Sequence, residues 1–297
     1  METDLYKVRS VQACFRAAYD LFTSNIKTII KKTWKSTLLL SALISLYQII
    51  LTNNSISLQT GIHSAHETIT YTATTITAAI ACMVTSVWFY ATIISLLNGR
   101  KRRENGMRIL RATLLYIGMF TVLLIATILL AGLAAILSLD KHCGGLPLPM
   151  VSSILTTLIL FIAWCIITLP TAYSCMKYIM EPNLKVGSIL GKPYRQGWRH
   201  WGFLFVCTLL TCIITWIGGF IVQSPSYIMM IALAVSKSGE AIGDISGLPT
   251  QFFPTFYVIN TLCTFVWCHI VIWVVMVYYY AYGSIETKNK ETTQVTI

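Results

Sequence analysis

The residues best suited to binding a metal in this chain are histidines that have acidic neighbours. One group lies in an early polar connector, and a second short group lies in a later one. Imidazole nitrogen and carboxylate oxygen are ligands that zinc or copper accepts. A site would form only if the two connectors met, whereas histidines three residues apart are common in polar loops. The metal-ligand candidates are His63, His66, Glu67, Asp140 and His142.

The nine cysteines favour apolar packing over a disulfide or metal framework. Most lie in apolar segments, Cys14 lies in an amphipathic one, and Cys143 alone lies in a connector expected on the outer face. A lone outer cysteine has no partner there, so the pattern argues against a disulfide framework. Two cysteine pairs in the last two apolar segments, with His269 beside one of them, would suit a buried metal or haem. Because buried cysteine mostly behaves as a small apolar side chain, we expect packing there and no cofactor.

The sequence motifs of nucleotide hydrolases and common hydrolases are missing. Residues 187–193 (GSILGKP) have the wrong spacing for a phosphate-binding loop and end in proline. His66 and Glu67 begin like a zinc-protease motif, but Thr70 stands where the second histidine is needed. The catalytic residues are therefore unknown, and the sequence favours a protein that is not an enzyme.

Composition determines which elements must position these residues. The chain is 56% hydrophobic and 11% charged, with a mean hydropathy of +0.69, which is far more apolar than a water-soluble domain of this length. Apolar runs of this length predict helices, because lipid offers no partner to an unpaired backbone amide. We expect an all-α polytopic bundle of six transmembrane helices in three hairpins. The predicted spans are 34–51, 71–97, 112–139, 151–176, 201–222 and 255–282.

The distribution of basic residues predicts the orientation. Of the 22 Lys and Arg residues, all but Lys141 and Lys237 fall before the first span or at its flank (Lys35), in alternate connectors or in the C-terminal tail. The positive-inside rule then places both termini of this multi-pass protein in the cytoplasm. The same distribution explains the net charge of +11 without nucleic acid, since basic connectors attract anionic lipid.

Residues 1–33 are expected to form a cytoplasmic amphipathic helix, followed by the membrane domain at 34–283 and a cytoplasmic tail at 284–297. Within residues 1–33, apolar residues recur at steps of three and four, and basic residues lie on the other face. Such a helix suits the membrane interface, and packing beneath the bundle is the alternative. The apolar positions are Val8, Val11, Phe15, Ala18, Phe22, Ile26 and Ile29.

Within the predicted spans, uncharged polar residues and prolines stand out. No Asp, Glu or Arg falls there, and the mid-span polar groups include Gln48, Asn260 and His269. Pro170 is expected to kink the fourth span and is our hinge candidate. The outer connector 223–254 contains a short apolar stretch between polar and glycine-rich sequence, which predicts a cap that is either a lid or a structural plug.

Two short sequences carry a family resemblance. Phe15 to Phe22 (FRAAYDLF) with Asn25 to Lys27, and Tyr194 to Trp201 (YRQGWRHW), resemble uncharacterised six-span bacterial inner-membrane proteins. That family is similar in layout to the membrane domain fused to some bacterial glycerophosphodiester phosphodiesterases. The resemblance implies a bacterial membrane protein without a catalytic residue of its own, because the chemistry of those fusions lies in a separate soluble domain.

Three functions remain open at this point. A non-catalytic membrane module that assembles with lipids, protein partners or a second copy of itself is favoured. A carrier or flippase for an uncharged or lipidic substrate is the alternative, since charged residues usually mark ion-coupled pathways. An intramembrane enzyme on a lipophilic substrate is the third, and would rely on His269 or the outer histidines.

The metal hypothesis is tested by calorimetric zinc titration of the purified chain and of a His63→Ala/His66→Ala variant. We expect indistinguishable titration curves, because isolated loop histidines bind zinc weakly. A stoichiometric binding event that disappears in the variant would instead establish a zinc site.

Overall fold

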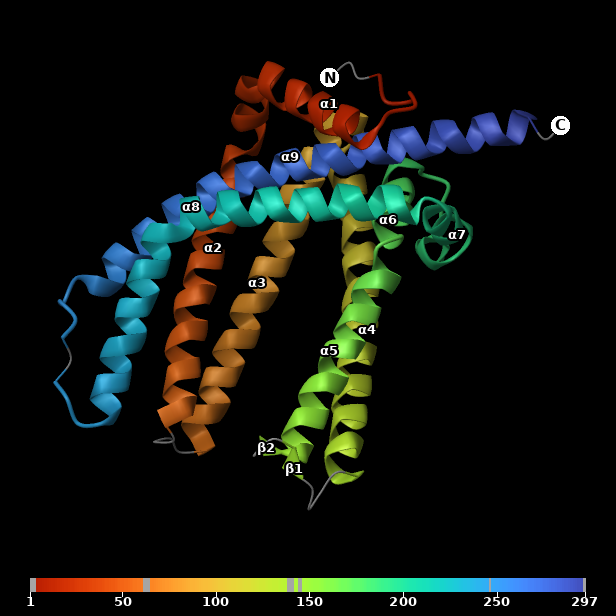
Figure 1. Ribbon diagram of the computed structural model, residues 1–297. Coiled ribbons are helices and arrows are strands. Elements are labelled where there is room, and N and C mark those ends of the chain that lie inside the picture. The colour runs from red at the N-terminus through yellow and green to blue at the C-terminus, as the bar shows by residue number, and fades with distance from the viewer. Residues whose placement is uncertain (1–3, 61–64, 138–141, 144–145, 246, 296–297) are drawn as a thin grey trace. The chain divides into compact units, whose positions relative to one another are not determined.

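The computed structural model describes residues 4–60, 65–137, 142–143, 146–245 and 247–295 (Figure 1). Helices dominate these residues, and the two β-strands contain two residues each and pair antiparallel. The elements are α1 (Val11–Ser24), α2 (Ile26–Thr60), α3 (Ala65–Asn98), α4 (Arg102–Leu137), β1 (His142–Cys143), β2 (Leu146–Pro147), α5 (Leu148–Thr168), α6 (Thr171–Met180), η1 (Val186–Leu190), α7 (Lys192–Arg199), α8 (Trp201–Ala241) and α9 (Phe252–Val295).

Six stretches of helix are long and apolar enough to cross a membrane. They are Ile26–Thr52, Thr68–Asn98, Arg102–Leu137, Pro149–Met180, Trp201–Glu240 and Phe252–Thr292. The prediction of an all-α polytopic bundle is confirmed, and the chain is a multi-pass membrane protein.

The helices group into two compact units. Unit 1 is formed mainly by Gln12–Gly106 and Leu209–Tyr280, and it contains α1, α2, α3 and most of α8 and α9. Unit 2 is formed mainly by Met107–Thr208 and Ala281–Ile297, and it contains most of α4, then α5 to α7 and the end of α9.

In unit 1, α2 pairs with α3, and α8 pairs with α9 (Figure 1). The first pair ends at Gly99, whose φ of 71° is a left-handed conformation that glycine adopts without strain. In α1, Cys14 and Ala18 are fully buried, and the ring of Phe15 lies edge-on to Trp273 of α9 with centroids 5.6 Å apart. The apolar face of α1 therefore packs on protein, as the alternative of packing beneath the bundle required.

The predicted N-terminal helix is shorter than expected. The chain turns at Asn25, whose side-chain amide donates to the Leu21 carbonyl over 3.0 Å. The Asn25 carbonyl accepts from the Ile29 amide over 2.9 Å and so begins α2. One asparagine thus ends α1 and starts α2, because its short amide can replace a missing backbone partner. The first span accordingly begins inside the segment that the sequence assigned to an interfacial helix.

In unit 2, α4 and α5 form a hairpin and Pro170 interrupts the helix that follows. The Ser152 hydroxyl donates to the Ala134 carbonyl over 3.2 Å, which joins the two helices. Helix α5 ends at Thr168 and α6 begins at Thr171, so Pro170 separates two helices. The Tyr194 hydroxyl donates to the Ile167 carbonyl over 2.8 Å, and partial burial raises the pKa of this phenol, which keeps it a donor at neutral pH. Movement at Pro170 stays a prediction.

Helix α8 is longer than the predicted fifth span. It continues without interruption to Ala241, so residues 227–235 are part of it and the connector begins beyond Ala241. Pro225 lies inside the helix, and Figure 1 shows α8 bending along its length. Proline cannot donate to the Ile221 carbonyl, and the Ser224 hydroxyl fills that acceptor over 2.9 Å. The predicted fifth span ended at residue 222, before this proline.

Helix α9 also extends further than the predicted sixth span. It runs from Phe252 to Val295, so most of the segment expected to be a tail is helical. Ser284 and Glu286 are buried there, which shows that unit 2 packs around the extension. The Ser284 hydroxyl accepts from the Arg9 amide over 2.9 Å and donates to the Arg9 carbonyl over 3.0 Å.

A glycine in α7 provides a test of this packing. A Cβ at Gly197 would lie 2.7 Å from the Pro170 carbonyl oxygen, whereas a Cβ at Gly202, in the first turn of α8, would meet no atom within 4 Å. Gly197→Ala should lower the stability of unit 2 by about 1–3 kcal/mol, since backbone must move. Gly202→Ala should change it by less than about 1 kcal/mol. Thermal unfolding in detergent compares the two, and equal melting temperatures would contradict the close approach of α7 to Pro170.

Candidate functional site

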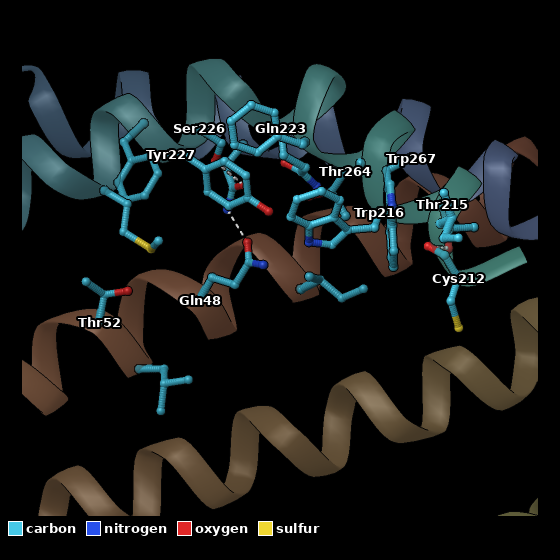
Figure 2. A pocket seen from close by; sticks show the side chains of 18 residues that line it. Gln48, Thr52, Cys212, Thr215, Trp216, Gln223, Ser226, Tyr227, Thr264 and Trp267 are labelled. Atoms are coloured by element: carbon cyan, nitrogen blue, oxygen red, sulfur yellow. Dashed lines mark hydrogen bonds between the residues drawn. The ribbon is translucent and has the colours of Figure 1, made fainter. Parts of the chain in front are cut away.

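Unit 1 contains a cavity of about 780 Å³ between α2, α8 and α9 (Figure 2). This volume is within the range of small-molecule sites. It corresponds to roughly 25 water molecules at about 30 Å³ each, which is too large for a packing defect in a close-packed interior. We call this cavity the unit 1 pocket.

The walls of the unit 1 pocket are mainly apolar and aromatic. Trp216 and Phe220 of α8 line it while remaining 74% and 60% exposed, so the pocket opens toward the surroundings of the helices. In a membrane-spanning helix, such exposed rings contact acyl chains. Phe256 of α9 is 1% exposed and packs with Phe252 and Leu233, which closes the pocket on another side.

A chain of uncharged polar groups crosses the pocket. The Ser226 hydroxyl donates to Oδ1 of Asn260 over 2.5 Å, and Nδ2 of Asn260 donates to Oε1 of Gln48 over 2.7 Å (Figure 2). Beside this chain, Nε2 of Gln223 donates to the Thr264 hydroxyl over 3.3 Å. Asn260 is 1% exposed, so its amide depends on these partners. We call these five side chains the amide network.

A glycine allows one wall to form. A Cβ at Gly219 would lie 2.9 Å from the indole nitrogen of Trp267, so only glycine lets this ring lie against α8. Both residues line the unit 1 pocket. Small residues in membrane helices commonly permit such close approach.

Of the metal candidates, only His66 has a described side chain. It is exposed near the start of α3, while His63 and Asp140 lie outside the described residues. Glu67 in α3 and His142 in β1 have described backbones only. Among the residues described, no group of three His, Cys, Asp or Glu side chains is placed to hold a metal ion. The zinc or copper site therefore stays a prediction.

Among the described residues, His269 and the cysteine pairs do not form a group that could bind a metal ion. Its Nδ1 donates to the Phe265 carbonyl over 2.8 Å. Its Nε2 is buried and has no hydrogen-bond partner in the described part of the chain. Cys207 and Cys268 are buried, in agreement with the expected apolar packing.

Sequence reasoning identified two members of the amide network and missed three. Gln48 and Asn260 stood out as mid-span polar groups. Gln223 and Ser226 were placed in the outer connector, beyond the predicted end of the fifth span at residue 222. Their spacing of three residues, and the spacing of four between Asn260 and Thr264, puts each pair on one helix face and is the signal that was available.

Unit 2 contains a second polar cluster, at the end of α6. Nζ of Lys177 lies 2.6 Å from Oε1 of Glu286, and the Tyr173 hydroxyl donates to the same oxygen. The Glu286 side chain is 9% exposed, so this is a nearly buried ion pair. It ties the extension of α9 to α6, and sequence reasoning missed it because the tail was expected to be solvated.

Arg108 of α4 completes this cluster. Its guanidinium donates to the carbonyls of Tyr178, Glu181 and Pro182, with distances of 3.0 Å from Nε to Tyr178 and 2.9 Å from Nη1 to Pro182. It also lies 4.1 Å from the centroid of the Tyr178 ring. The carbonyls at a helix C-terminus carry partial negative charge, so a cation there stabilises the end of α6.

The fold and the pocket define a six-span α-helical membrane protein with a lipid-facing pocket that contains an uncharged amide network. No family model, no curated protein and no solved structure matches the chain. The resemblance to six-span bacterial inner-membrane proteins stays a prediction.

The ion pair of unit 2 is tested by a double-mutant cycle. Lys177→Met leaves the nearly buried Glu286 carboxylate without its cation and should cost about 3 kcal/mol. Glu286→Met leaves Lys177 with Glu181 at 3.7 Å and should cost less. The double variant should recover most of that loss, because neither charge then remains. Unfolding free energies in detergent measure the coupling, and additive single effects would show that the pair contributes nothing specific.

Proposed function

We propose that this protein is a non-catalytic membrane module that binds an uncharged, lipid-like molecule in the unit 1 pocket. The observation that carries the proposal is a cavity of about 780 Å³ with apolar walls open to the surroundings and an uncharged amide network inside. Sites for small apolar molecules share this plan, with a few polar groups placed among apolar side chains.

The charge of the pocket supports an uncharged occupant. Among the described residues that line it, none is Asp, Glu, Lys, Arg or His. An ion or a charged headgroup would leave water there without a counter-charge, at a cost of several kcal/mol. An uncharged amphiphile suits both the apolar walls and the amide network. Its apolar chain contacts the aromatic side chains, and its polar group approaches the network.

A carrier for the same class of molecule is the second candidate. The observation that favours it is Pro225, which lies beside Ser226 and Gln223 of the pocket and bends α8. A helix with a missing backbone hydrogen bond can change its bend at low cost, which would open or close the pocket. The enzyme hypothesis has less support, since His269 is not among the described lining residues.

The setting of this function is also proposed. The distribution of Lys and Arg supports cytoplasmic termini, and the family resemblance supports a bacterial inner membrane. The partners are then the lipid bilayer, other membrane proteins or a second copy of the chain, with no nucleic acid.

The proposal is tested by mass spectrometry of lipids that remain with the detergent-purified chain. We expect the natural chain to retain an uncharged lipid at near-stoichiometric amount, and Asn260→Leu to lose most of it with the network. Thr52→Trp, which fills part of the pocket without removing a member of the network, should also reduce retention severalfold.

The matched control is Thr121→Val on α4. Thr121 is exposed and its hydroxyl donates to its own helix at Ile117 over 2.9 Å, so the change should leave retention unaltered. Retention of the same lipids by all four proteins would contradict binding in the unit 1 pocket.

A further inference from the structure

The direction of the hydrogen bonds in the amide network restricts the chemistry of the occupant. An amide oxygen only accepts, so Ser226 donates to Asn260 and Asn260 donates to Gln48. This series of hydrogen bonds ends at Oε1 of Gln48, which accepts. The NH₂ group of the same side chain takes no part in the series. This NH₂ has no partner among the described residues, and Gln48 lines the pocket (Figure 2).

A second donor faces the same space. The Trp216 indole lines the pocket, and in Figure 2 its nitrogen faces the region beside Gln48. No described residue accepts from this N–H either. Two N–H donors, on α2 and on α8, thus belong to side chains that line the same pocket.

A pure hydrocarbon in this position would leave both donors unmatched, at a cost of about 1–3 kcal/mol for each that is desolvated. A carboxylate or phosphate would accept from them but lacks a cation among the described lining residues. A carbonyl oxygen has two lone pairs and no charge, and so satisfies both donors.

We infer that the unit 1 pocket binds acyl lipids whose polar group is an uncharged ester or amide, with its carbonyl oxygen accepting hydrogen bonds from the Gln48 amide and the Trp216 indole. This inference rests on the proposed lipid-binding function and specifies the chemical class of the bound lipid. The apolar chain lies along Phe220 and Tyr227, where the wall is exposed to lipid.

The test compares two brominated probes of equal chain length, a fatty-acid methyl ester and an alkane. The full chain is reconstituted in nanodiscs, and quenching of tryptophan fluorescence by bromine reports occupancy next to Trp216 and Trp267. A variant with both tryptophans changed to Phe gives the background from the other six of the eight. The ester should quench at roughly tenfold lower concentration than the alkane, as expected for about one net hydrogen bond.

Gln48→Met should abolish the preference for the ester while keeping alkane quenching, because Met preserves the shape of the wall. Trp216→Phe, at an exposed position that leaves the fold intact, should reduce the preference when Trp267 is the reporter. Gln12→Met is the matched control, since Gln12 is an exposed residue of α1 outside the pocket, and it should keep the full preference.

The outcomes separate the two proposals. No quenching above background by either probe contradicts lipid binding in the pocket itself. Equal quenching by ester and alkane in the natural chain contradicts the carbonyl inference and leaves the pocket as an apolar site. An ester preference that persists in Gln48→Met also overturns the inference.

Discussion

The structure depends on one constraint, which is that lipid offers no hydrogen-bond partner to a polar group. Two helix breaks among the described residues are each accompanied by a local replacement. The carbonyl left free by Pro225 accepts from the Ser224 hydroxyl, and the Ile167 carbonyl near Pro170 accepts from Tyr194. These replacements let the chain bend without leaving buried backbone unpaired.

The same constraint explains why the polar residues of the two units form networks of different kinds. In unit 1 the partners of Asn260 are uncharged. The amide network therefore lies among apolar walls without any charge that would need a counter-ion. In unit 2 the charged residues Lys177 and Glu286 pair at the end of α6, where Arg108 also holds the helix carbonyls. Charges are tolerated there because each has a partner at hydrogen-bond distance.

The bend at Pro225 lies beside the amide network, and residues on both sides of this proline line the cavity. Helix α8 keeps its contact with α9 through the bend, since Gln223 before it bonds to Thr264 and Ser226 after it bonds to Asn260. Gly219 then brings Trp267 against α8, which shapes one wall. The pocket is thus a product of a proline, a glycine and large aromatic residues acting together.

The sequence by itself determined the class of protein, because long apolar runs in a chain with few charges have one stable form in lipid, the helical bundle. It also identified Gln48 and Asn260, since amides are costly within spans and so stand out. Only the tertiary structure decided that these two side chains meet, that α8 continues past Pro225, and that Glu286 is buried against Lys177. These features depend on which helices become neighbours, and hydropathy and periodicity describe each helix alone and carry no information about its neighbours.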